Sequence, residues 1–129
     1  MRGTGLIEVA IATALLAVLA LGIAPLLIGA VRANADARLE LDAAAAATTR
    51  MEQLLIAPFA EPLSPVDALA VDEPGFNDVI ASHSAALRRR WSVTTLGVDP
   101  DARVISVRIL ADGRPPLVTF TTVRSREGP

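Results

Sequence analysis

Few residues in this chain have the chemistry needed for catalysis or metal binding. The 129 residues include a single histidine, His83, and no cysteine. The lack of cysteine excludes disulfides, thiolate metal sites and a cysteine nucleophile. The sequence also contains no phosphate-binding loop, no nucleophile elbow and no pair of carboxylates with acid–base spacing. We therefore expect that the protein is not an enzyme and that it has no cofactor and no resident metal.

Three polar groups in the C-terminal half have simpler explanations than a functional site. His83 stands between two serines, and we expect a solvated loop histidine. Asp99-Pro100-Asp101 has the composition of a turn, which explains its carboxylates without a bound cation. The run Arg88-Arg89-Arg90 predicts a solvated face, and contact with a partner or with lipid headgroups is the alternative.

The most unusual residue is Glu8, because it directly precedes a long apolar run. Residues Val9–Val31 include no charged side chain. As a helix, these 23 residues would be about 35 Å long, which is enough to cross a bilayer core of about 30 Å with some tilt. Gly22 and Pro25 lie inside the run, and membrane helices tolerate both. The run therefore predicts a transmembrane helix with one carboxylate at its edge.

Two general explanations for this N-terminus stay open. A signal peptide would be cut after Ala33-Asn34-Ala35, although the apolar run is longer than the roughly 7–15 residues of a typical signal core. A plain single-span anchor would hold Glu8 in its first helical turn, where the helix dipole favours a carboxylate by about 0.3–1 kcal/mol. Either explanation would make the chain a membrane-anchored or exported binding domain.

The helix is expected to continue beyond the apolar run. Residues 32–56 contain neither proline nor glycine, and Pro58 is expected to end the helix. A narrow stripe recurs at spacings of three and four residues, which predicts an amphipathic second half. The stripe consists of Leu41, Ala44, Thr48, Met51 and Leu55.

Beyond Pro58 the pattern changes twice. Residues 58–84 are rich in proline and predict an irregular segment. From Arg90 the period is two, which predicts three strands near 90–96, 104–109 and 117–123. Turns are expected at 97–102 and at Asp112-Gly113, and such short links imply an antiparallel meander. The predicted fold is therefore α+β, with a long N-terminal helix and a small three-stranded antiparallel sheet packed on its C-terminal half.

The overall charge argues against one class of partner. The formal net charge is −2, with 12 Lys and Arg residues that are all arginine and 14 Asp and Glu residues. A nearly neutral chain gives no electrostatic reason to bind nucleic acid.

The N-terminal stretch Gly3-Thr4-Gly5-Leu6-Ile7-Glu8-Val9 resembles the processing site of type IV prepilins and type II secretion pseudopilins. In that pattern a glycine precedes the cut, and an often aromatic residue, a small polar residue, two aliphatic residues, a glutamate and an aliphatic residue follow. Thr4 and Gly5 depart from the pattern, whereas Gly3 and Leu6-Ile7-Glu8-Val9 match it. Pro25 also matches the register of the helix-kinking proline of the family. The strand sequences look like the small sheet of minor pilins, closest to the type IV pilus modification class and to the small minor pseudopilins of secretion systems.

The resemblance implies a division of the chain and a role for each part. Residues 1–3 would be a leader, 4–31 a transmembrane and filament-core helix, 32–57 its amphipathic continuation, and 58–129 a periplasmic or extracellular head. A prepilin peptidase would cut between Gly3 and Thr4, the new amine at Thr4 could be N-methylated, and Glu8 would be an assembly contact.

The resemblance also implies partners and a location. Before assembly the chain would lie in the lipid bilayer of the bacterial inner membrane as a single-pass protein with its head in the periplasm. Its partners would be other pilin or pseudopilin subunits and an inner-membrane assembly platform, and it would then enter a pilus or pseudopilus.

Overall fold

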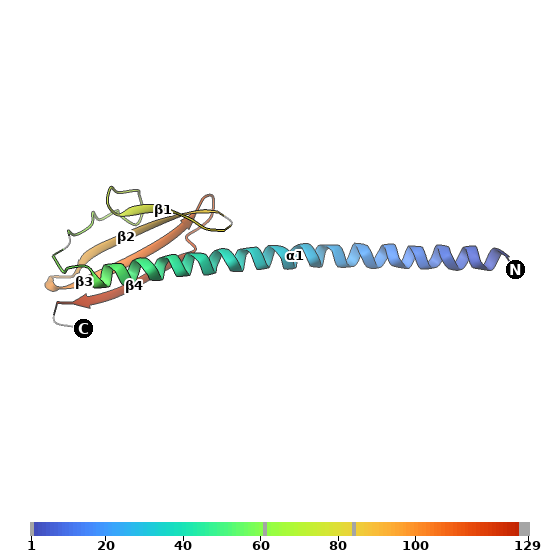
Figure 1. The fold of residues 1–129 in the computed structure, drawn as a ribbon, viewed down its shortest axis with the longest axis horizontal. Helices are drawn as coiled ribbons and strands as arrows, with labels where there is room; N and C mark the ends of the chain where they lie inside the picture. The colour runs from blue at the N-terminus through green and yellow to red at the C-terminus, as the bar shows by residue number, and fades with distance from the viewer. Residues whose placement is uncertain (1, 61, 84, 127–129) are drawn as a thin grey trace. The chain divides into compact units, whose positions relative to one another are not determined.

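A computed structural model describes residues 2–60, 62–83 and 85–126 of the chain. The elements follow in the order α1, β1, β2, β3 and β4 (Figure 1). The chain divides into two compact units, residues 1–37 and residues 38–129, and α1 contributes to both.

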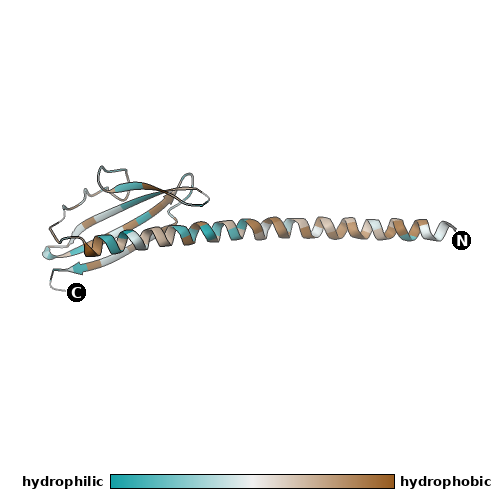
Figure 2. Ribbon diagram, viewed as in Figure 1, coloured by the Kyte–Doolittle hydropathy of each residue, from teal (hydrophilic) through white to brown (hydrophobic). Residues whose placement is uncertain are grey.

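The helix α1 spans Arg2–Ile56 and contains 55 residues, including Pro25. Figure 2 shows that hydrophobic residues dominate the N-terminal part of α1. The helix ends one residue before the predicted boundary. At this end the guanidinium group of Arg124 donates hydrogen bonds to the carbonyl oxygens of Leu54 and Ala57, at 3.4 and 2.6 Å. Because the last carbonyls of a helix lack intrahelical donors, Arg124 stabilises the C-terminal end of α1.

The sheet of the C-terminal unit is an antiparallel meander with the strand order β1-β2-β3-β4. Its strands are β1 (Asn77–Ala81), β2 (Ala86–Leu96), β3 (Asp99–Ala111) and β4 (Val118–Ser125). The α+β class and the meander are confirmed, and β2, β3 and β4 contain the three predicted strands. The sheet has one more strand than predicted. Strand β1 lies inside residues 58–84, so the prediction that this whole segment is irregular is wrong there. The strand is only five residues long, so its sequence carries little periodic signal.

The hairpin between β2 and β3 is tighter than the predicted turn of residues 97–102. Leu96 pairs with Asp99, and Gly97 adopts a positive φ of 58°. Asp99 begins β3, and the register of β2 and β3 shifts between Thr95 and Leu96. Because Thr95 pairs with Arg103, residues 100–102 of β3 have no partner in β2 and form a bulge in the ladder. The second predicted turn is confirmed, because β3 ends at Ala111 and Gly113 adopts a φ of 71°.

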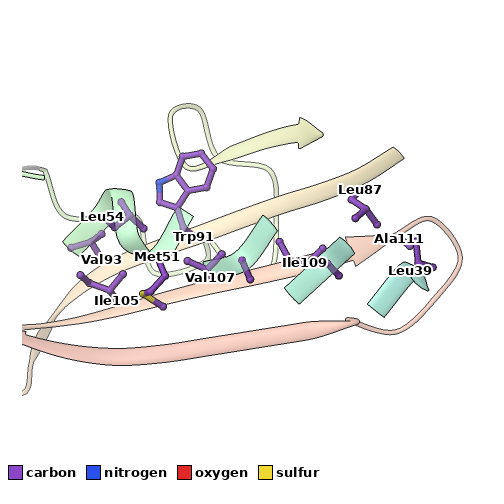
Figure 3. Close-up of a cluster of buried hydrophobic side chains, with 12 residues drawn as sticks. Leu39, Met51, Leu54, Leu87, Trp91, Val93, Ile105, Val107, Ile109 and Ala111 are labelled. Carbon is purple, nitrogen blue, oxygen red and sulfur yellow. The ribbon is translucent and has the colours of Figure 1, made fainter. Parts of the chain in front are cut away.

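The core of the C-terminal unit lies between the end of α1 and one face of the sheet (Figure 3). The core side chains of α1 follow one another at spacings of four, four, four and three residues, so they lie on one face of the helix. The core side chains of β2 and of β3 are separated by even numbers of residues, so they lie on one face of the sheet. The guanidinium carbon of Arg50 also lies 3.8 Å from the centroid of the Trp91 ring. The buried residues of this cluster are Leu39, Ala43, Ala47, Met51, Leu54, Leu87, Trp91, Val93, Ile105, Val107, Ile109 and Ala111.

The predicted stripe of the amphipathic half is wrong in phase. Of its members only Met51 belongs to the buried core, whereas Leu41 is 69% exposed and Leu55 is 39% exposed. The predicted stripe was placed on the face of α1 that contains Leu41 and Leu55, because these are large apolar side chains. The sheet instead packs on Ala43 and Ala47, both fully buried, because small side chains let a helix approach a sheet closely.

Candidate functional site: the N-terminal segment of α1

The four residues with expected roles, Gly3, Thr4, Glu8 and Pro25, all lie on α1 within the N-terminal unit. All four are exposed. Thr4 and Glu8 are four residues apart, so they lie on one face of the helix about 6 Å apart along its axis. The geometry therefore places the Glu8 side chain within one turn of the residue that cleavage would make N-terminal. Met1 of the expected leader lies outside the described residues.

The apolar side chains around these residues have no partner within the described part of the unit. An 18-residue window of this helix has a mean hydropathy of 2.6, and none of the window is buried. The large apolar residues from Leu6 to Val31 are 50–76% exposed. The helix is long and apolar enough to cross a membrane, which fits membrane anchoring or a secretion signal.

The polar groups within the apolar run are few. Thr13 is the only residue with a polar side chain between Val9 and Val31, and its Oγ1 donates a hydrogen bond of 2.5 Å to the carbonyl oxygen of Val9. Pro25 has no N–H and so cannot donate to the carbonyl oxygen of Leu21, yet α1 continues through it. Glu8 is therefore the one carboxylate at the edge of a surface that is otherwise compatible with lipid.

The histidine of the C-terminal unit lies beside a serine and an aspartate, but not in a catalytic arrangement. Ser82 Oγ donates a 2.7 Å hydrogen bond to Asp42 Oδ2, and His83 Nδ1 lies 3.6 Å from the same oxygen. A nucleophilic serine would need to donate to the imidazole. The His83 side chain is 98% exposed, as expected for a solvated loop histidine. The hydrogen bond from Ser82, and then the proximity of His83, lower the pKa of Asp42 below its usual range.

A shallow cleft of about 190 Å³ adjoins this group. Ile80, Leu87 and small side chains of α1 line it together with Asp42 and His83. The cleft therefore lies between α1 and the turn that follows β1.

The sequence predicts a solvated arginine run at the start of β2, and this prediction is wrong for Arg90, whose side chain is 13% exposed, and for Arg89. The Arg89 side chain is only 11% exposed and forms two hydrogen bonds to the Asp78 carboxylate, at 2.9 and 2.5 Å. It also donates to the carbonyl oxygen of Ala46 on α1 at 3.1 Å. Arg89 therefore joins β1, β2 and the helix, and sequence spacing alone gave no signal for it.

The other two arginines of the run hold a loop on the opposite face of the sheet. Arg88 and Arg90 both bind the carboxylate of Asp72, and Arg90 Nη1 also donates to the carbonyl oxygen of Ala70 at 2.5 Å. The hydrogen bond from Arg90 and the nearby positive charges lower the pKa of Asp72. Arg88 and Arg90 therefore fix a segment with no regular secondary structure to β2, whereas Arg89 fixes β1 and α1.

Asp99 and Asp101 bind groups of the chain itself. Asp99 Oδ1 accepts a hydrogen bond from the backbone N–H of Asp101 at 2.9 Å, and Asp101 pairs with Arg126 at 3.1 Å. Within residues 2–60, 62–83 and 85–126, no three His, Asp or Glu side chains come together as metal ligands.

Comparison with protein-family models, with curated proteins and with solved structures found no match. A single apolar N-terminal helix with an antiparallel sheet packed on its C-terminal half is consistent with a pilin-like fold.

Proposed function

We propose that this chain is a minor pilin or pseudopilin, a structural subunit of a type IV pilus or of a type II secretion pseudopilus. A prepilin peptidase would cut it between Gly3 and Thr4. The observation that carries the proposal is the place of Glu8 at the edge of an apolar helical segment that none of the described residues buries. Such a surface needs lipid or other apolar helices around it, and a filament subunit meets both in succession.

The proposed role of Glu8 follows from the charge that cleavage creates. Hydrolysis leaves a free amine on Thr4, which carries a positive charge at neutral pH with or without a methyl group. An isolated charge at the centre of a membrane costs roughly 2.5–3.5 kcal/mol. Pairing of the amine with Glu8, on the same subunit or on a neighbour, neutralises both charges and favours one axial register between subunits.

The C-terminal unit would form the head of the subunit. Its core is closed by α1 on one face of the sheet, so it does not require the apolar run for its own packing. The proposed partners are other subunits of the filament, the prepilin peptidase and the inner-membrane assembly platform. The proposed location is the inner membrane, with the head in the periplasm, and then the filament.

Intact mass analysis of the mature protein tests this proposal. A chain that starts at Thr4 would support it, whereas a start at Asp36 would indicate a signal peptide and a start at Met1 a plain anchor. Gly3→Leu should leave the precursor uncut. Gly29→Leu is the matched control, because Gly29 is also exposed on α1 and far from the expected cut. A normal mature mass for Gly3→Leu would reject Gly3 as the processing site.

A further inference from the structure

The first turn of α1 contains an unusual pair of glycines. Gly3 and Gly5 flank Thr4, and both belong to the helix, which begins at Arg2. A Cβ atom built on either glycine would meet no atom within 4 Å in the described chain. Neither glycine has a positive φ. Packing and backbone geometry within the chain therefore do not require glycine at these two positions.

The same turn contains the peptide bond whose cleavage is proposed. In an α-helix the carbonyl oxygen of residue i accepts a hydrogen bond from the N–H of residue i+4. The carbonyl of Gly3 is thus engaged by the N–H of Ile7, and the carbonyl of Thr4 by that of Glu8. In cleavage, water adds to the carbonyl carbon of Gly3, the C–N bond breaks, and the products are a Gly3 carboxylate and a Thr4 amine. The helical turn must open before this carbon is accessible on the extended chain that proteolysis requires.

We infer that Gly5 sets the rate of processing by keeping the first turn of α1 easy to unwind. This inference rests on the proposed cleavage between Gly3 and Thr4. Glycine is among the least favourable residues in a helix, because its unfolded chain has the greatest freedom to lose. When opening is fast relative to cleavage, the rate of proteolysis follows the population of the open state. Gly5 lies on the retained side of the cut, so it can be replaced without changing the leader.

Gly5→Ala and Gly5→Thr distinguish control of cleavage by helix unwinding from control by the size of the side chain at this position. Alanine is the strongest helix former and is small, whereas threonine is larger and a poor helix former. If unwinding controls the reaction, Gly5→Ala should slow cleavage about three- to fivefold, and Gly5→Thr should stay within about twofold of the natural chain. If the peptidase measures side-chain size, the order of the two variants reverses.

The experiment follows the full-length precursor in membranes that contain a prepilin peptidase, with a mass-spectrometric time course of the cut at Gly3–Thr4. Gly22→Ala is the matched control, because Gly22 is an exposed glycine of the same helix, far from the cut. Hydrogen exchange of the amides of residues 5–8 provides the second measurement. Slower exchange and slower cleavage in Gly5→Ala alone would support the inference.

Two outcomes would overturn the inference about Gly5 without contradicting the proposed cleavage. Equal cleavage rates in all variants, or a slower rate for Gly5→Thr than for Gly5→Ala, would reject the role of unwinding while the cut itself stands. A natural chain that keeps its Gly3–Thr4 bond in the presence of the peptidase would reject the proposed function and this inference together.

Discussion

Arg89 offers a direct test of how the head is held together. Its guanidinium group is nearly buried, binds Asp78 through two hydrogen bonds and reaches the carbonyl oxygen of Ala46 on α1. Arg89→Ala removes all three hydrogen bonds and leaves the Asp78 carboxylate without its cation. We expect the substitution to destabilise the head and to detach β1 first, because β1 has only β2 as a neighbouring strand.

The magnitude follows from the burial of the two partners. Breaking a fully buried ion pair costs about 3–5 kcal/mol, whereas an exposed pair contributes at most about 1 kcal/mol. The Asp78 side chain is 38% exposed, so water partly compensates for the lost arginine. We therefore expect a loss of about 2 kcal/mol, which corresponds to a decrease in Tm of about 10 °C for a unit of this size.

Trp91 makes the measurement specific to the head. It is the only tryptophan of the chain and is 5% exposed in the core, so its fluorescence reports unfolding of the C-terminal unit. Urea and thermal unfolding of the full chain in detergent micelles would be followed by this signal. Arg88→Ala is the matched control, because the Arg88 side chain is 40% exposed and Asp72 keeps Arg90 as a partner. The explanation would be refuted if Arg88→Ala destabilised the head as much as Arg89→Ala.

Two further predictions concern assembly and pH. Glu8→Ala should leave membrane insertion and cleavage intact but abolish incorporation into sheared filaments. Glu40→Ala, a control on the exposed surface of α1, should assemble normally. Recovery of Glu8→Ala in filaments would contradict the pairing of Glu8 with the Thr4 amine. Asp42 and Asp72 have lowered pKa values in the fold, so their stabilising contribution is complete above the unfolded pKa of about 3.9 and disappears as the pH falls through the folded values. The stability measured by urea unfolding and Trp91 fluorescence should therefore be constant from pH 7 to pH 5 and should begin to fall below about pH 4. Asp72→Asn should make this fall smaller, and a stability that stays unchanged down to pH 3 would contradict the assignment.

The sequence predicted the parts of the fold that depend on local chemistry. The apolar run, the absence of helix breakers in residues 32–56 and Pro58 located α1 to within one residue of its end. Alternation of β-branched and polar residues located the centres of β2, β3 and β4. These signals are strong because each depends on neighbours within a few residues.

The failures of the sequence interpretation have a shared cause. The face of α1 that packs on the sheet, the strand β1 and the burial of Arg89 all depend on which segments meet in space. In an alanine-rich helix the hydrophobic pattern is weak, and Leu41 misled the assignment of the inner face. A charged side chain such as Arg89 is buried only when a carboxylate and a carbonyl from distant segments come within reach, and no local pattern encodes that encounter.

The candidate site itself depends almost entirely on sequence. Gly3, Thr4, Glu8 and Pro25 lie on one helix, so their spacing alone determines which of them share a face. The tertiary structure determined instead how the head is closed: which face of α1 the sheet covers, and how arginines fix β1 and the loops. The difference is physical, because positions along a helix are fixed by its own hydrogen bonds, whereas the packing of helix on sheet is decided by side chains that are distant in the sequence.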